Sequence, residues 1–284
     1  MKGKRGGLGA LCYLAVFVLA LLALPALLLF ARRPAGDEVT LPVVVYHGVC
    51  ETEAGAGEYT VSAKQLEADL AALVRAGYTP VRLADVMGYA LKGGPLPRKP
   101  VLLVFDDGEA GVARWALPVL EKFNAPAVVS VIGDGAAGLQ GRSGEYLTWS
   151  QLAALEDTGL VELQSHSASL HTYARPGVKR LAGESKEDYA ALLRADIHRM
   201  EAMAGEAGVT LLPAFAYPYG ALDDDAEAVL RQAGVRVTMT GEEKANRLTR
   251  APECLFRLGR IARPSTLTTA QFMAKLEQTR HAPA

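Results

Sequence analysis

The sequence lacks an excess of charge of either sign. It carries 30 basic and 31 acidic residues, for a net charge of −1, and it has no charge run or low-complexity tract. A chain that neutralises nucleic-acid phosphates needs clustered basic residues. We therefore expect no nucleic-acid partner.

Cysteine is also scarce, with 3 residues in the chain. Cys12 falls in an apolar N-terminal stretch, so Cys50 and Cys254 are the only pair available for a bridge. Cys50 follows a predicted strand and Cys254 precedes one, which would place them at opposite ends of a parallel barrel. We expect both thiols to be unpaired.

The one long hydrophobic run lies at the N-terminus. Basic residues precede the almost wholly apolar stretch Leu8 to Ala31, and Arg32 and Arg33 follow it. A secretory apolar region is typically ~7 to 15 residues, whereas ~20 apolar residues are needed to cross a bilayer. The pattern predicts an uncleaved, single-pass signal anchor. Cleavage near Pro25, which would give a secreted protein, is the alternative.

The anchor is expected over residues 1–34, followed by a linker over 35–40 and one catalytic domain over 41–284. Because a basic N-terminal flank tends to stay in the cytoplasm, the domain is expected outside it. The length suits one large core, since single α/β barrels commonly run to roughly 250 residues.

Apolar strand patterns alternate with helix patterns along the whole domain. Ser62 and Gln65 form a capping-box signature, and Gly77 stands where the helix that follows should end. This alternation predicts an α/β fold, a distorted barrel of seven or eight parallel strands without a second domain. The predicted strands cover residues 43–46, 79–82, 101–105, 127–132, 161–164, 214–217, 235–240 and 256–261.

Three of these strands end in polar groups that can carry protons or bind metals. His47 follows the first strand, Asp106 and Asp107 follow the third, and His166 follows the fifth, with His171 soon after. Ligands gather at the carboxyl ends of parallel strands, so we expect these side chains to converge. Taken alone, Asp-Asp-Gly is equally typical of a turn, and two nearby histidines are typical of a solvated loop.

The motifs resemble the polysaccharide deacetylases of carbohydrate esterase family 4. The acid motif stands here as Phe105–Gly108 (FDDG), the histidine motif as His166–His171 (HSASLH) and a third motif as Tyr217–Gly220 (YPYG). The resemblance covers roughly residues 41–261 and implies a metal-dependent hydrolase. The early Tyr-His-Gly element and the histidine spacing are most similar to the exported poly-N-acetylglucosamine deacetylases of biofilm systems.

In that branch the general acid is a histidine near the start of the domain. No histidine occurs here between His198 and His281, where most of the family places its acid, so the resemblance implies His47 for this role. The family arginine that precedes the Pro-Tyr motif is Ala216 in this chain. Arg260, or else Arg263, is a candidate to orient the base in its place, and a surface salt bridge is the alternative.

One carboxylate and two neutral imidazoles, Asp107, His166 and His171, make a three-ligand open site for a divalent metal. Zinc is the first candidate, with cobalt, nickel or iron as alternatives. The loop between the two histidines must curve, because residues five apart face opposite sides of a straight strand. Asp106 is then free to act as the general base.

Two tyrosines are candidates for contacts with the substrate. The backbone N–H of Tyr219 can stabilise an oxyanion, with the preceding proline fixing the local geometry. The rings of Tyr219 and Tyr173 can stack on sugars, although aromatic side chains more often belong to a core.

These residues predict a membrane-tethered, monomeric N-deacetylase whose partners are the membrane and an acetylated, N-acetylglucosamine-containing polysaccharide outside the cytoplasm. The first alternative is an esterase that removes O-acetyl groups from xylan or wall glycans, since the same groups serve either bond. The others are a non-catalytic glycan-binding domain and phosphoryl transfer at a magnesium site. No phosphate-cradling glycine-rich loop supports the last.

Overall fold

The computed structural model describes residues 38–141, 144–175 and 177–281. The predicted signal anchor, 1–34, and the first half of the predicted linker, 35–37, lie outside these residues. Across the described ranges, no helix has the length and apolarity needed to cross a bilayer. β1 (Val39–Leu41) pairs antiparallel with β11 (Asn246–Leu248), so regular structure begins inside the stretch expected to be a linker.

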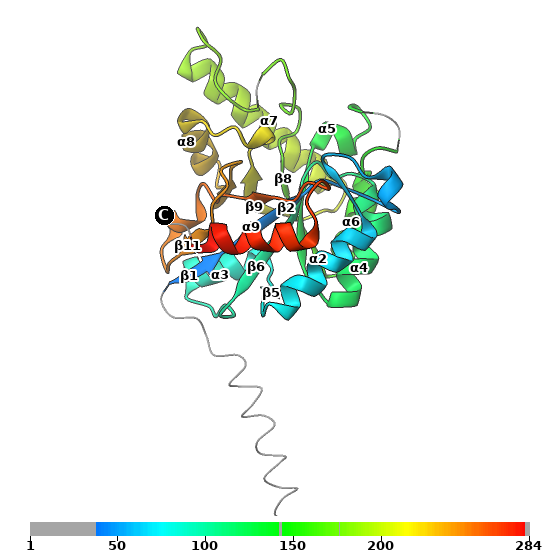
Figure 1. Cartoon of the computed structure of the whole chain (residues 1–284). Coiled ribbons are helices and arrows are strands. Elements are labelled where there is room, and N and C mark those ends of the chain that lie inside the picture. The colour runs from blue at the N-terminus through cyan, green and yellow to red at the C-terminus, as the bar shows by residue number, and fades with distance from the viewer. Residues whose placement is uncertain (1–37, 142–143, 176, 282–284) are drawn as a thin grey trace, which may run out of the picture.

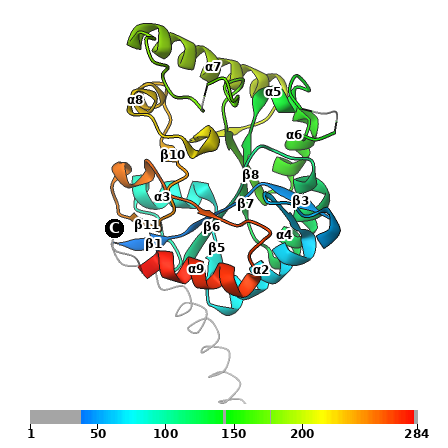
Figure 2. The ribbon, with the colours of Figure 1, turned by 45° about the horizontal axis from the view of Figure 1, so that its top comes forward.

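Eight parallel strands form one curled sheet at the centre of the molecule (Figure 2). Their order is β10-β9-β8-β7-β6-β2-β12, and β5 pairs with the beginning of β6. The strands are β2 (Val43–Tyr46), β5 (Thr79–Pro80), β6 (Pro100–Phe105), β7 (Ala127–Val131), β8 (Val161–Ser165), β9 (Leu211–Ala216), β10 (Val237–Met239) and β12 (Ile261–Ala262).

Each predicted strand overlaps one strand of this sheet, so the parallel α/β class is confirmed. The last predicted strand, 256–261, is wrong in most of its length, and the barrel is therefore not regular. Arg257 adopts a left-handed φ of 59°, which a continuous strand does not allow. Leu258 bridges to Met239 of β10, and only Ile261–Ala262 pairs with β2.

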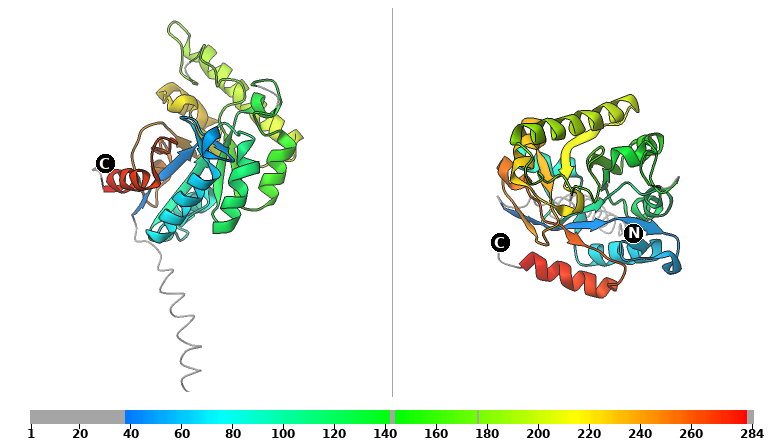
Figure 3. Two further views of the ribbon diagram at one scale, coloured as in Figure 1. Left: turned by 45° about the vertical axis from the view of Figure 1, so that its right-hand side comes forward. Right: turned by 90° about the horizontal axis from the view of Figure 1, so that it is seen from above.

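The helices surround the curled sheet when the molecule is seen from above (Figure 3). α2 (Ala63–Arg75) begins with the predicted capping box: Gln65 N donates to Ser62 Oγ at 3.1 Å, and Ser62 N donates to Gln65 Oε1 at 2.9 Å. α2 packs against α9, as Figure 1 shows. The other helices are α3 (Leu83–Lys92), α4 (Leu117–Phe123), α5 (Gly133–Ala136), α6 (Trp149–Asp157), α7 (Lys186–Glu206), α8 (Asp224–Gln232) and α9 (Thr269–His281).

β6 is buried on both faces, as a strand of a parallel sheet should be. Leu103 and Phe105 pack with residues of the outer helices, whereas Leu102 and Val104 pack with the inward side chains of the other strands. Successive side chains alternate along a strand, so Asp106, the next residue, continues the inward series. The sequence thus delivers a carboxyl group to the mouth of the barrel.

Two shorter features differ from the expected helices and loops. The first turn of the predicted helix 111–123 is a π-helix, η2 (Val112–Ala116), which leads into α4. β3 (Gly48–Cys50) and β4 (Thr60–Ser62) form a small parallel pair directly after His47. Cys50 and Cys254 are both free thiols.

Candidate active site

Asp106 lies at the carboxyl end of β6 and is almost fully buried. Its backbone N–H donates to Tyr46 O at 2.9 Å, which continues the pairing of β6 with β2. Arg260 Nη1 donates to Asp106 Oδ2 at 2.6 Å, while Oδ1 is buried and has no partner among the described residues. Burial opposes ionisation and is the largest single effect, but the Arg260 charge and smaller contributions from neighbouring groups together outweigh it and hold the pKa of Asp106 well below its usual range.

Arg260 therefore stands where the sequence analysis placed it. It is 5% exposed, so the surface salt-bridge alternative is wrong. Its Nε also donates to Thr240 O at 2.8 Å, which fixes the guanidinium group. Arg263, the second candidate, pairs with Asp69 instead of Asp106. The orienting role of Arg260 stays a prediction.

Asp107, His166 and His171 lie together beside Asp106. Asp107 Oδ1 lies 3.5 Å from His166 Nε2 and 3.5 Å from His171 Nε2. One ligand atom from each of the three residues falls within 4.8 Å of the others. Asp107 adopts a left-handed φ of 69°, which turns its side chain out of the strand series that Asp106 follows.

The ring of His166 is oriented by a backbone carbonyl. Its Nδ1 lies 2.8 Å from Ala216 O, and because a carbonyl only accepts, Nδ1 carries the proton. In the neutral ring, Nε2 then keeps a free lone pair on the side of Asp107. Burial lowers the pKa of His166 to about 4 and also lowers that of His171, so both rings are neutral at pH 7.

The loop between the two histidines is curved, as their chelation requires. Ser167 adopts a left-handed φ of 73°. Asp196 of α7 accepts hydrogen bonds from Ala168 N at 2.9 Å and from Ser169 N at 2.8 Å. Gln140 Nε2 donates to His171 O at 3.0 Å. These bonds hold the loop in the shape that brings both imidazoles to one side.

The three residues fit a divalent metal ion. One carboxylate and two imidazole nitrogens are the donors that zinc and similar ions prefer. Asp107 Oδ1 is buried without a hydrogen-bond partner among the described residues, although it faces both histidines. Burial, followed by the neighbouring Asp106 charge, raises the pKa of Asp107 to about 6. A bound cation would remove that cost, because it favours the ionised carboxylate.

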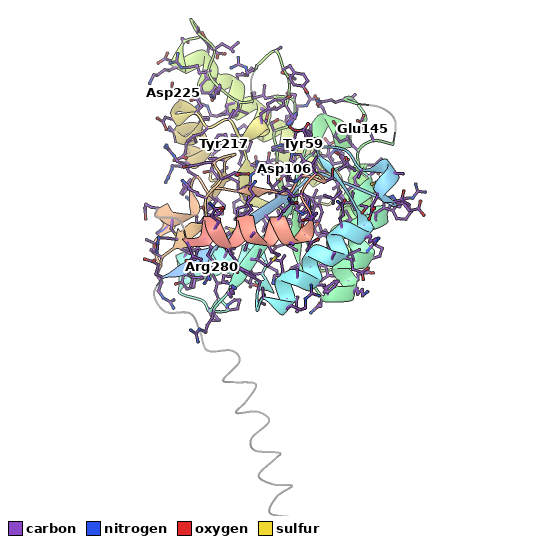
Figure 4. The ribbon with its side chains drawn as sticks, in the orientation of Figure 1. Tyr59, Asp106, Glu145, Tyr217, Asp225 and Arg280 are labelled. Atoms are coloured by element: carbon purple, nitrogen blue, oxygen red, sulfur yellow. The ribbon has the colours of Figure 1, made fainter. Side chains whose placement is uncertain are left out.

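His47 lies on the other side of the two aspartates. It follows β2, which pairs with β6, and its position lets it lower the pKa of both Asp106 and Asp107 electrostatically. Its ring meets the ring of Tyr59 edge to face, with centroids 5.3 Å apart. In Figure 4, Tyr59 is labelled in the same upper part of the molecule as Asp106. His47 is thus placed next to the reacting groups.

Tyr219 and Tyr173 continue the row of rings beyond His171. The Tyr219 ring lies 4.4 Å from the His171 ring, and the Tyr173 ring stacks on Tyr219 at 5.5 Å. Tyr219 adopts a left-handed φ of 56° in the turn Pro218–Gly220. The structure therefore places every predicted site residue around one centre, while the role of each remains a prediction.

Two residues near this centre, Tyr146 and Asp196, were not predicted from the sequence. Tyr146 lies close enough to Asp107 and Tyr219 for both to raise its pKa, which burial chiefly brings to about 12. Its backbone bridges to Glu109, just after the FDDG motif. Tyr146 stands in a glycine-rich loop without periodicity, and Asp196 stands mid-helix, so neither has a local signal. Only the long-range packing reveals them.

The chain matches the family described as "Polysaccharide deacetylase" over residues 93–238, about half of its length. It is 26% identical over 187 residues to the poly-beta-1,6-N-acetyl-D-glucosamine N-deacetylase of Staphylococcus aureus strain MSSA476, covering 66% of this chain and 63% of that protein. The corresponding Staphylococcus epidermidis protein is 27% identical over 163 residues, covering 57% and 55%. This chain thus spans less than two thirds of these relatives.

Solved structures share the fold over most of the described domain. IcaB from Ammonifex degensii superposes with a TM-score of 0.68 at 26% identity, covering 87% of this chain and 98% of that one. The deacetylase PplD of Streptococcus pyogenes superposes with a TM-score of 0.66 at 20% identity, covering 88% and 100%. The motif residues, the curled parallel sheet and the family match agree: the chain belongs to the polysaccharide deacetylase family.

Proposed function

We propose that this protein is a metal-dependent hydrolase that removes N-acetyl groups from a polysaccharide containing N-acetylglucosamine. The single observation that carries the proposal is the pairing of a buried carboxylate, Asp106, with Arg260 immediately beside the Asp107–His166–His171 cluster. A base held ionised next to three metal donors is the combination that hydrolysis of an amide requires.

Asp107, His166 and His171 would hold the ion. When bound, such an ion polarises the acetyl carbonyl and acidifies a water molecule. Arg260 favours the ionised form of Asp106, and the free Oδ1 of Asp106 can accept the proton of the attacking water. Asp106 and Asp107 thereby divide two tasks between adjacent carboxylates, one held by an arginine and the other facing the imidazoles.

The remaining steps fall to residues on either side of the aspartates. The Tyr219 N–H can donate to the oxygen of the acetyl group as negative charge develops on it. His47 can then donate a proton to the sugar nitrogen as the C–N bond breaks, so that acetate and a free amine leave. Without that proton the intermediate would expel water and return to the amide.

The glucosamine substrate is supported by two observations. The Staphylococcus relatives carry the name of a poly-beta-1,6-N-acetyl-D-glucosamine N-deacetylase. His47 stands beside the aspartates, and an amine leaving group depends on a proton donor more than an alkoxide does. Removal of O-acetyl groups by the same residues is the competing outcome.

We further propose that the protein acts outside the cytoplasm while tethered to the membrane. The proposal rests on the apolar stretch Leu8 to Ala31 and the basic residues that flank it. β1 starts at Val39, so a chain without residues 1–33 keeps every described strand and helix. This truncated chain should be soluble and active. Recovery of the intact full-length protein in the soluble fraction would contradict the anchor.

The proposed function is tested by measuring amine release and acetate release from defined glycans. The substrates are N-acetylglucosamine oligomers, with β-1,6 linkage first, and an O-acetylated xylan oligomer. Amine should appear from the N-acetylated oligomers, should disappear after chelation and should return when zinc is added. Acetate from the xylan oligomer with no amine from any glucosamine oligomer would replace the proposal by the esterase. If neither amine nor acetate is released, a non-catalytic glycan-binding domain is favoured.

A further inference from the structure

The chain enters the domain at the end of the sheet that lies opposite the active site. Asp106 follows the carboxyl end of β6, whereas Val39 of β1 comes just before β2 begins at Val43. Because β2 and β6 run parallel, the entry lies at the amino edge of the sheet. Figure 4 labels Asp106 in the upper part of the molecule, and Figure 1, in the same orientation, labels β1, α3 and β5 in the lower part.

α3 lies across this amino edge. At its beginning, Leu83 N donates to Glu162 Oε2 of β8 at 2.6 Å. At its end, Arg250 Nη1, just after β11, donates to Gly93 O at 2.6 Å. Val86, between these ends, is buried among the inward side chains of the strands. α3 thus reaches from β8 to the segment beside the entry of the chain, and its outer face is exposed.

Three exposed basic side chains at this edge have no acidic partner among the described residues. They are Arg75 at the end of α2, Lys92 at the end of α3 and Arg98 in the loop that leads into β6. The end of α2 and this loop are held together, because Lys99 Nζ donates to Ala76 O at 3.0 Å. We call the surface of Arg75, Lys92 and Arg98 the basic edge.

Acidic side chains do not neutralise the basic edge. Those beside it are Glu38, Asp85, Glu253 and Glu277. Glu38 pairs with Arg247 at 2.8 Å, and Glu277 pairs with Lys99 at 2.8 Å. The two acids that remain are outnumbered by the unpaired basic residues. The surface therefore keeps a positive charge.

Two exposed apolar side chains accompany these charges. Val74, 47% exposed, precedes Arg75, and Leu91, 37% exposed, precedes Lys92. Basic side chains next to exposed apolar ones are typical of surfaces that lie in the headgroup region of a bilayer. Their aliphatic stems can cover apolar surface while the charged ends reach the headgroups.

Resting on the proposed membrane tether, we propose that the basic edge docks on the anionic phospholipid headgroups of the membrane that holds the anchor. From Ala31, the last residue of the apolar stretch, to Glu38 the chain can span at most about 25 Å. A domain of this length is about 45 Å across. The anchor therefore holds the amino edge against the bilayer, and the active site faces away from it, toward the glycan.

The first test uses the full-length protein reconstituted in vesicles of phosphatidylcholine alone or of phosphatidylcholine and phosphatidylglycerol in equal parts. Trypsin, which cleaves after lysine and arginine, is added to both. Cleavage after Lys92 should be slower by at least about 5-fold in the anionic vesicles, the worth of one basic residue at such a surface, and added salt should remove the difference. Cleavage after Lys179, an exposed residue of the loop before α7, should be equal in both and is the control.

Charge variants identify the residues that make the contact. Arg75→Gln combined with Arg98→Gln leaves the Lys92 cleavage site in place and should remove most of its protection. Arg194→Gln, which removes an exposed and unpaired arginine of α7 among the described residues, is the matched control and should keep the protection. Equal cleavage after Lys92 in both kinds of vesicle, or full protection in the double variant, would overturn the docking.

Turnover in the same vesicles tests the orientation. Amine release from soluble N-acetylglucosamine oligomers should be equally fast in both, because the active site faces away from the bilayer. Slower release in the anionic vesicles would place the active site against the membrane and overturn the proposal. Protein that is not recovered with the vesicles would contradict the tether and with it the docking. Protection of Lys92 without any amine release would leave the docking intact and contradict only the proposed reaction.

Discussion

Arg260 and Arg263 are three residues apart, and each pairs with a buried aspartate, but the two pairs differ in how completely the aspartate is satisfied. Arg263 donates to Asp69 Oδ2 at 2.7 Å and to Oδ1 at 3.1 Å, and Thr269 Oγ1 donates to Oδ1 at 2.7 Å. Arg260 donates to only one oxygen of Asp106, and the other has no partner among the described residues.

The difference separates a structural pair from a reactive one. The Asp69 pair joins α2, the start of α9 and the segment after β12, and Tyr46 OH adds a bond of 3.3 Å from β2. A buried carboxylate whose oxygens are all occupied has nothing left to offer a substrate. The Asp106 pair keeps the carboxylate charged and leaves one oxygen free, as a general base needs.

The largest effect on stability is expected at the structural pair. Arg263→Met leaves the Asp69 charge buried without its cation, which should lower the free energy of unfolding by about 3 to 5 kcal/mol. Chemical denaturation measures this loss. Arg247→Met, which removes an exposed pair with Glu38 between β11 and the start of the domain, should cost at most about 1 kcal/mol. Similar costs for the two variants would show that the buried pair is not structural.

Tyr46 bonds to Asp69 of the structural pair, whereas His47, the next residue, lies near Asp106. A change at His47 therefore tests the Asp106 region and leaves the Asp69 region intact. His47→Gln should keep fold and metal while slowing amide cleavage by ~10² to 10⁴, the usual contribution of a positioned general acid. The loss should be smaller on an activated aryl acetate, whose leaving group needs no proton. Equal losses on both substrates, or loss of the metal, would mean that His47 is a ligand or a structural residue.

Arg260→Gln should act on the pH profile of the reaction. Arg260 lowers the pKa of Asp106, so without this charge burial dominates and the pKa rises. A base with a raised pKa is protonated up to a higher pH, so the acidic limb of kcat/KM should move upward by about 1 to 3 pH units. A destabilised but folded Arg263 variant should keep the wild-type limb. If the acidic limb of kcat/KM in Arg260→Gln stays at the wild-type pH, Arg260 does not control the ionisation of the base.

The smallest effect is expected at the cap of α2, the helix that carries Asp69. Ser62→Ala removes one oxygen of the capping box and should cost about 1 kcal/mol of stability. The kcat/KM of the remaining folded enzyme should equal that of the wild type. A change in turnover would show that α2 is coupled to the site more tightly than the Asp69 pair explains.

The sequence was informative wherever a pattern is local. The Ser62–Gln65 capping box and the end of the strand before Asp106–Asp107 are encoded in neighbouring residues, and the structure has both. The strand expected over 256–261 failed, because apolar residues there do not reveal the left-handed turn at Arg257. The role of Asp69 could not be predicted, because this residue lies on the buried side of α2 and its partner Arg263 is distant in the sequence.

The same limit applies to the site. The motifs predicted the candidate metal ligands, because each of these residues stands at a strand end or soon after one, and Arg260 was predicted as a substitute for the family arginine that is Ala216 here. Tyr59 lies in a short turn, and nothing in the sequence says that this turn folds over His47. Asp196 lies in α7, and its hydrogen bonds to the histidine loop depend on how that helix packs. Local sequence therefore predicts the candidate catalytic and metal-binding residues. Long-range packing determines which other residues surround the site and hold its loops in place.

The central claim is that adjacent aspartates divide two roles, with Asp106 as the base and Asp107 as a metal ligand. The most direct measurement is the metal content and amine release of Asp106→Asn and Asp107→Ala in parallel, with His166→Ala and His171→Ala as companions to the second. Asp106→Asn should keep its metal and lose turnover by ~10² to 10⁴, whereas the other three should lose metal and activity together. If Asp106→Asn loses its metal as completely as Asp107→Ala, the division of roles is contradicted.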